Sequence, residues 1–200
     1  RLLGNIAGLS ALDLCAAPGG KTLQLAAAGA KVRAIDISAT RLGRIEENLA
    51  RTKLTAQLEV QDALEYQGAD YDIILLDAPC SATGTIRRHP DLPYAKDGSE
   101  FFELIELQSG MIDHATSLLK PGGRLVFCTC SLLPDEGECQ IEEALKRHPG
   151  LKIDPSAFEA GFVDSQMRSV PEGLRLRPDM LPEQGGLDGF FISILRWDGQ

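Results

Sequence analysis

Short apolar runs alternate with amphipathic helical patterns along this chain, and that alternation constrains its fold more than any other feature. We predict strands at 11–15, 31–36, 57–60, 71–77, 123–130, 173–177 and 189–197. Helices are predicted at 19–29, 38–51, 100–119 and 135–148. Such alternation is typical of a parallel, doubly wound α/β sheet. The last two strands have no helix between them, which predicts an antiparallel hairpin at the end of the sheet.

Local signals set the ends of two helices. Ser38 directly precedes an amphipathic run, and we predict that it caps that helix at its N-terminus. The motif Pro121-Gly122-Gly123 follows the long helical pattern, and we predict that it stops the helix there.

Two stretches carry neither pattern. The polar stretch 78–99 is longer than an ordinary connection, so we expect it to be functional, and 154–185 is expected to cover one edge of the sheet. At 200 residues and 44% hydrophobic content, the chain is large enough for one domain over 1–200 with a sizeable core. The first strand follows Arg1 closely, which indicates a piece of a longer protein.

Composition disfavours several functions. The net charge of −9 and the pI of about 4.8 argue against tight autonomous binding of RNA or DNA, because domains that do so are usually basic. No apolar run approaches the roughly 18 residues of a membrane span, so we expect no membrane contact. The five cysteines, an odd number without metal-ligand spacing, indicate a reducing, cytoplasmic compartment and no metal site. We expect a monomer.

Cys80 and Cys130 each follow an apolar run that is predicted to be a strand. In a parallel sheet the carboxyl ends of the strands meet at one edge, where open α/β folds hold their ligands. Two thiols at that edge, with a glycine-rich loop upstream, indicate covalent chemistry on an unreactive ring. The alternative is a pair of buried structural cysteines, since free cysteine is among the most buried residue types.

The glycine-rich loop at 12–22 joins the first strand to the first helix. Gly19 and Gly20 let the backbone approach a ligand, and the helix N-terminus offers free N–H groups. A P-loop also ends in Gly-Lys-Thr, but Cys15 stands at the position of its first glycine, which disfavours a nucleoside triphosphatase. The loop instead resembles the first motif of S-adenosylmethionine-dependent methyltransferases, which wraps the methionine and ribose of the cofactor.

Three more residues lie where a nucleoside would bind. Asp36 ends the second strand, where an acidic residue accepts hydrogen bonds from ribose hydroxyls in dinucleotide-type folds. Asp62 follows the third strand and is placed to meet the adenine edge. Arg41 could reach the cofactor from the second helix. A solvated strand end for Asp36 and a surface side chain for Arg41 are the ordinary alternatives.

Four segments in order resemble the Sun/Fmu family (RsmB-type, NOL/NOP/Sun) of RNA cytosine C5-methyltransferases, whose bacterial members modify 16S ribosomal RNA. The matching segments are 13–22, 77–85, 88–91 and 129–132. The resemblance implies a doubly wound, Rossmann-like sheet of about seven strands, mostly parallel with an antiparallel C-terminal hairpin. It implies S-adenosyl-L-methionine as cofactor and RNA rather than DNA as partner, with the cytosine unpaired or flipped out. A missing N-terminal RNA-binding domain would agree with the acidic charge.

The resemblance also assigns roles to the two thiols. Carbon 5 of cytosine is a poor nucleophile, so a thiolate first adds to carbon 6, and a base later removes the carbon 5 proton. The family pattern makes Cys130 of the Thr-Cys motif the nucleophile and Cys80 of the Pro-Cys motif the release base. DNA cytosine methyltransferases attack with the Pro-Cys thiol instead, so the Thr-Cys motif favours the RNA enzymes.

Asp77 and Lys21 complete the predicted catalytic group. The Asp77 carboxyl would contact the amino group or ring N3 of cytosine, and Lys21 would hold Asp77 and the base. A turn cap for Asp77 and a solvated lysine for Lys21 are the alternatives. The predicted cofactor-binding residues are Cys15, Ala16, Ala17, Pro18, Gly19, Gly20, Lys21, Asp36, Arg41, Asp62 and Asp77. A transfer-RNA enzyme of the same chemistry and a catalytically silent RNA-binding homologue are alternative functions.

Overall fold

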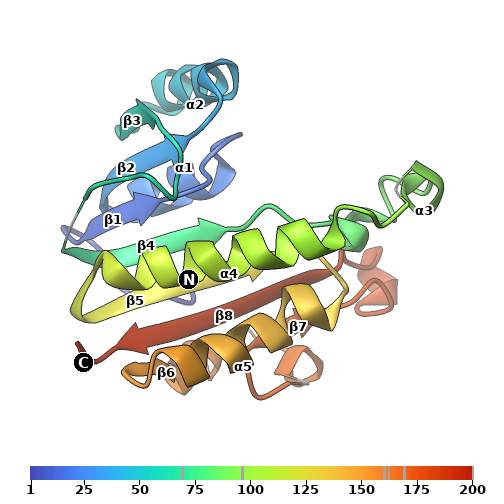
Figure 1. Ribbon diagram of the computed structural model, residues 1–200. Coiled ribbons are helices and arrows are strands. Elements are labelled where there is room, and N and C mark those ends of the chain that lie inside the picture. The colour runs from blue at the N-terminus through green and yellow to red at the C-terminus, as the bar shows by residue number, and fades with distance from the viewer. Residues whose placement is uncertain (69, 96, 160, 162, 169, 200) are drawn as a thin grey trace.

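One mixed β-sheet forms the centre of the molecule (Figure 1). The computed structural model describes all residues except 69, 96, 160, 162, 169 and 200. Within this part the sheet has eight strands in the order β3-β2-β1-β4-β5-β8-β6, and β7 also pairs with β8. The strands are β1 (Ser10–Asp13), β2 (Lys31–Asp36), β3 (Gln57–Val60), β4 (Tyr71–Asp77), β5 (Leu119–Thr129), β6 (Leu151–Ile153), β7 (Leu174–Leu176) and β8 (Phe190–Trp197).

Helices cover both faces of the sheet. The α-helices are α1 (Gly20–Ala27), α2 (Ala39–Thr52), α3 (Leu92–Ala95), α4 (Phe101–Ser117) and α5 (Glu138–Arg147). Short 3₁₀ helices lie at Thr83–Thr85, Pro134–Glu136, Pro155–Phe158, Ser165–Arg168 and Pro182–Gln184. Along β4, Ile74 and Leu76 face α4 and α5, whereas Ile73 and Leu75 face the side of α1. Figure 1 shows α4 and α5 in front of β4, β5 and β8, and the predicted doubly wound α/β fold is confirmed.

Strand pairing explains where a ligand can bind. β1 is parallel to both β2 and β4, and β3 and β5 extend the parallel part on either side. The chain leaves β1 toward one edge of the sheet and β4 toward the other, which opens a crevice at the carboxyl ends of these strands. β8 is antiparallel to β5 and to β7, so the predicted C-terminal hairpin is confirmed.

The prediction of about seven strands was wrong by one. The additional strand is β6, which pairs antiparallel with the end of β8. It has only three residues, with the burial pattern buried, exposed, intermediate. A run this short carries too few residues for a recognisable alternation.

The prediction for Pro121-Gly122-Gly123 was also wrong, because α4 ends at Ser117 before reaching the motif. The motif lies inside β5, at an irregularity in its pairing with β4. Gly122 adopts a φ of 83° there, a left-handed conformation that favours glycine. The motif therefore accommodates a bulge in a strand instead of ending a helix.

Two other local predictions agree with the structure, whereas β5 begins four residues before its predicted start and α5 three residues after it. The Ser38 hydroxyl accepts the backbone N–H of Arg41 at 3.3 Å and caps α2, as predicted. The stretch 154–185 contains β7, which pairs along an edge of β8 as expected. Among the described residues, no helix combines the length and the apolar character that crossing a membrane requires.

Candidate active site

A cavity of about 470 Å³ lies at the carboxyl ends of the parallel strands. Its walls come from the segments that follow β1, β2, β3, β4 and β5, together with α2 and α4. The predicted residues that line it are Cys15, Ala17, Asp36, Arg41, Asp62, Asp77, Cys80 and Cys130. A second cavity of about 420 Å³ adjoins the same loop and is lined by Ala16, Pro18, Gly20 and Lys21 among others. The fold therefore brings both predicted groups to one edge of the sheet.

The glycine-rich loop is fixed by hydrogen bonds before it enters α1. The Ala16 N–H donates to the Ile35 carbonyl at 2.9 Å, and the Ala17 N–H donates to the Asp36 carboxylate at 3.0 Å. Gly19 has a φ of 100°, and a Cβ there would lie 2.9 Å from Ile45. Gly19 thus shapes the turn and lines neither cavity, whereas its neighbours Pro18 and Gly20 line the second cavity.

Asp36 and Arg41 organise this loop in addition to lining the cavity. Asp36 is buried, and its second carboxylate oxygen accepts the Ser38 N–H at 2.9 Å. Arg41 donates to the Ala17 carbonyl at 2.7 Å and lies 3.6 Å from Asp36. The interpretation of Asp36 as an ordinary solvated strand end is therefore excluded by its burial. Each carboxylate oxygen has a second lone pair, so a ligand hydroxyl could still donate to Asp36.

Lys21 and Asp77 form an ion pair at the carboxyl edge of the sheet, where β4 ends. The Lys21 Nζ lies 2.6 Å from Asp77 Oδ2, with each side chain about one third exposed, and 5.1 Å from the centre of the Phe190 ring. Burial opposes the charge of Lys21, but the charge of Asp77 and its hydrogen bond hold the pKa of Lys21 above the ordinary value. Lys21 is consequently a permanent cation beside Asp77, and the alternative of an unattached solvated lysine does not apply.

The Sγ atoms of Cys80 and Cys130 are 3.5 Å apart. A thiol of Cys80 can therefore donate a hydrogen bond to a thiolate of Cys130. This hydrogen bond lowers the pKa of Cys130, and the same contact, together with burial, raises the pKa of Cys80. The contact favours one thiolate beside one thiol, and Lys21, which also lowers the pKa of Cys130, favours Cys130 as the thiolate.

The other thiols near the site are poorly suited to ionise. Cys128 is buried, and its thiol donates to Asp77 at 3.4 Å. Burial and the Asp77 charge raise the pKa of Cys128 well above its ordinary value. Burial and the charge of Asp13 raise the pKa of Cys15 to about 12, so Cys15 contributes shape to the cavity and no nucleophile.

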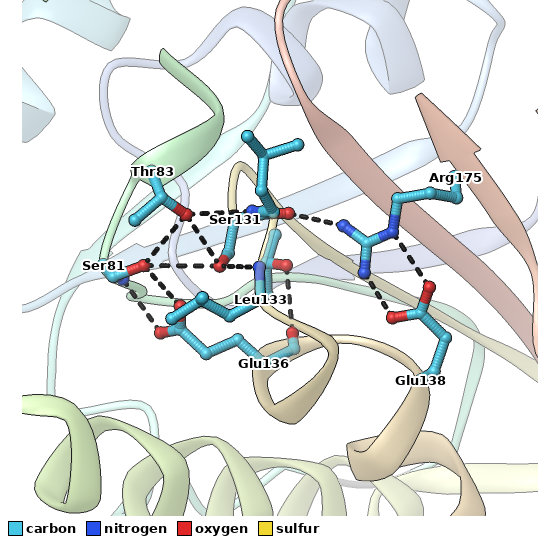
Figure 2. Close-up of polar contacts among 9 residues, drawn as sticks. Ser81, Thr83, Ser131, Leu133, Glu136, Glu138 and Arg175 are labelled. Atoms are coloured by element: carbon cyan, nitrogen blue, oxygen red, sulfur yellow. Dashed lines mark hydrogen bonds and ion pairs between the residues drawn. The ribbon is translucent and has the colours of Figure 1, made fainter. Parts of the chain in front are cut away.

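Sequence reasoning missed two buried acids at this edge. Asp13 accepts the Thr22 hydroxyl at 2.6 Å on one oxygen, while its Oδ1 has no hydrogen-bond partner in the described part of the chain. Burial raises the pKa of Asp13 to about 7. Glu136 is completely buried and accepts hydrogen bonds from Ser81 (Figure 2). Only the position of Asp13 at a strand end could have identified it; no local signal marks Glu136.

The stretch 78–99 carries Cys80 near its start, and its later part contacts the segment before β8. Arg88 forms an ion pair with Asp188 at 2.7 Å, and Arg87 donates to the Gly185 carbonyl. These contacts tie the loop to the segment before β8. His89 and Asp91 are exposed. Among the described residues, no three His, Cys, Asp or Glu side chains are grouped as metal ligands would be.

Comparison with known proteins connects this geometry to one family. A family profile described as "16S rRNA methyltransferase RsmB/F" matches residues 5–196. Ribosomal RNA small subunit methyltransferase B of Pectobacterium carotovorum is 43% identical over 195 aligned positions, covering 94% of this chain and 42% of the relative. The protein of the same name from Vibrio cholerae is 41% identical over 195 positions, with the same coverage of 94% and 42%.

A solved structure shows the same similarity in three dimensions. NSun6 from Pyrococcus horikoshii with SFG superposes with a TM-score of 0.81 at 30% identity, covering 96% of this chain and 48% of that one. The chain thus spans less than half the length of these relatives.

Proposed function

This chain belongs to the 16S rRNA methyltransferase RsmB/F family, and on that premise we propose that it is the catalytic part of an S-adenosylmethionine-dependent RNA cytosine C5-methyltransferase. Small-subunit ribosomal RNA is the proposed substrate, in keeping with the names of its relatives. The observation that carries the proposal is the 3.5 Å separation of the Cys80 and Cys130 sulfurs. Two thiols at hydrogen-bonding distance suit a reaction that needs both a nucleophile and a base.

The residues around the cavity that contains Cys80 and Cys130 fit the cofactor. Its volume of about 470 Å³ lies within the usual range for small-molecule sites. Asp36 and Asp62 offer acceptors for ribose hydroxyls and an adenine amino group, and the exposed side chain of Ile37 offers an apolar surface to the purine. In the adjoining cavity, the space around Gly20 lets the backbone approach the ligand. When bound, S-adenosylmethionine supplies an electrophilic methyl group.

In the proposed reaction the Cys130 thiolate adds to carbon 6 of cytosine, and the new bond makes carbon 5 nucleophilic enough to accept the methyl group. Once Cys130 is bonded to carbon, it no longer carries the negative charge that opposes ionisation of Cys80. Cys80 can then lose its proton to solvent and remove the proton from carbon 5. The electron pair re-forms the double bond between carbons 5 and 6, and Cys130 leaves as a thiolate.

Asp77 and Lys21 are proposed to select and hold the base. A carboxylate at Asp77 accepts from the exocyclic amino group of cytosine, which uracil lacks. The 2.6 Å ion pair with Lys21 orients that carboxylate. Loss of either side chain should therefore affect the chemical step as well as discrimination between the two bases.

We propose that affinity for RNA comes mainly from a region outside these residues. The net charge of −9 opposes binding to a polyanion. The relatives named above are more than twice as long as the part that this chain matches. An RNA-binding domain in the remaining sequence would supply the positive surface that this domain lacks.

Methyl transfer to defined RNAs tests the proposed function. Full-length protein is incubated with unmodified small-subunit ribosomal RNA and methyl-labelled cofactor, and the RNA is digested to nucleosides. We expect label in 5-methylcytidine, and none with the Cys130→Ala control. Label in transfer RNA alone would favour the transfer-RNA alternative. Cofactor binding by calorimetry without methyl transfer to any RNA would contradict the proposal and favour a silent RNA-binding homologue.

A further inference from the structure

A buried polar cluster lies between the two loops that carry the cysteines (Figure 2). The reaction proposed above gives it no direct role, because in the described part of the chain the hydrogen bonds that join its members do not involve a cysteine sulfur. We call it the Glu136 cluster, and its members are Ser81, Thr83, Gln108, Ser131 and Glu136.

The Glu136 carboxylate accepts two hydrogen bonds from Ser81, the residue that follows Cys80. Its Oε1 accepts the backbone N–H of Ser81 at 2.8 Å, and its Oε2 accepts the Ser81 hydroxyl at 2.5 Å. The Gln108 amide donates to Oε1 at 3.0 Å. The side chain of Glu136 is completely buried, and each of these donors is uncharged.

Glu136 and its partner Ser81 together hold the chain on both sides of Cys130. Thr129, directly before Cys130, donates its hydroxyl to the Glu136 carbonyl at 3.0 Å. The hydroxyl of Ser131, directly after Cys130, lies 3.3 Å from the Ser81 hydroxyl. Glu136 therefore fixes the two cysteine loops to each other through contacts one residue away from each thiol.

Burying a carboxylate costs free energy, and neutral donors compensate for that cost less well than a cation would, so this is an unfavourable way to join two loops. The two acceptor oxygens of Glu136 lie in one plane, so together they fix both the position and the orientation of Ser81. We propose that Glu136 is a positioning residue for methyl transfer, which sets the separation between the Cys80 and Cys130 thiols. This inference rests on the proposed function, since that reaction is what requires two thiols at this distance.

The acidity of Cys130 reports the alignment without RNA or cofactor. A well-placed Cys80 thiol stabilises the Cys130 thiolate, so misalignment should make Cys130 less acidic. Asp77 opposes the thiolate and Lys21 favours it, and neither side chain is altered in the test. Removing the negative charge of Glu136 would by itself make Cys130 more acidic. The sign of the shift therefore separates positioning from a purely electrostatic effect.

Alkylation of the full-length protein by iodoacetamide, resolved by mass spectrometry, measures that acidity. Glu136→Ala is expected to raise the pH midpoint of Cys130 alkylation by about one unit, which slows alkylation at pH 7 about tenfold. In a Cys80→Ala background the same substitution should not raise the midpoint, because only the electrostatic effect of the lost charge remains. A lowered or unchanged midpoint, or an equal rise in both backgrounds, would overturn the inference. Thr116→Val, which loses a buried hydrogen bond within α4, is the stability control and should leave the midpoint unchanged.

A second variant tests the inference if Glu136→Ala does not fold. Ser81→Ala removes the hydroxyl donor to Glu136 and leaves only a small space, and it should shift the midpoint in the same direction. Methyl transfer separates the inference from the proposed function: Glu136→Ala should lower kcat about 100-fold at unchanged KM for RNA. An inactive wild type would contradict the proposed function, and the alkylation result would still decide whether Glu136 positions the thiols.

Discussion

At the scale of single residues, burial and close neighbours determine which groups ionise at this site. Cys80 and Cys130 share one hydrogen bond, and that contact lowers the pKa of Cys130 while it raises that of Cys80. Cys128 is only two residues from Cys130, yet burial raises the pKa of its thiol well above the ordinary value. The sequence alone shows three cysteines near two strand ends; their different acidities depend on contacts that only the fold creates.

Asp13 provides a prediction about pH and stability. Burial raises its pKa to about 7, so the folded protein keeps it protonated below that pH, whereas the unfolded chain ionises it above about pH 4. The unfolded state therefore binds fewer protons in this window, and the contribution of Asp13 to stability falls as pH rises from 4 to 7. Asp13→Asn should abolish this decline while retaining an acceptor for Thr22.

Urea unfolding at pH 4.5 and pH 8 measures the effect. The free energy of unfolding of Asp13→Asn, relative to wild type, should increase between these pH values by on the order of 1–4 kcal/mol. A difference that does not change with pH would show that Asp13 is ionised throughout.

At the scale of elements, strand ends could be predicted from sequence and contacts between loops could not. The run Ile73-Ile74-Leu75-Leu76 is buried on both faces, so its length and composition were sufficient to place Cys80 just beyond a strand. Ser81 and Glu136 are 55 residues apart, and neither lies in a periodic pattern that would indicate their contact. Two predictions about elements were wrong for local reasons. β6 was missed because it is too short to show a pattern, and Pro121-Gly122-Gly123 forms a strand bulge and does not stop a helix.

The turn before α1 yields a prediction with a matched control. Gly19 has a φ of 100°, and an added Cβ would lie within 2.9 to 3.2 Å of three Ile45 atoms. Gly19→Ala should lower the free energy of unfolding by about 1–3 kcal/mol, because both backbone strain and overpacking oppose it. A Cβ at Gly20 would meet nothing within 4 Å. Gly20→Ala should therefore change stability by less than about 0.5 kcal/mol, and equal losses in the two variants would contradict this account of the turn.

At the scale of the whole molecule, a doubly wound sheet brings together residues that are far apart in the chain. Lys21 and Asp77 are 56 residues apart, and Cys80 and Cys130 are 50 residues apart, yet each pair is in contact at the carboxyl edge. The acidic surface gives this edge no general attraction for RNA. We therefore propose that the chemistry belongs to this domain and the RNA affinity to the longer protein, and that the two thiols divide the covalent cycle.

Covalent trapping tests that claim most directly. Full-length Cys80→Ala, incubated with substrate RNA and S-adenosylmethionine, should accumulate a protein–RNA adduct, seen as a slow band on a denaturing gel, because the carbon 5 proton is not removed. Cys130→Ala and the double variant should form no adduct, because neither has the attacking thiol. An adduct with Cys130→Ala and none with Cys80→Ala would contradict the account and make Cys80 the nucleophile.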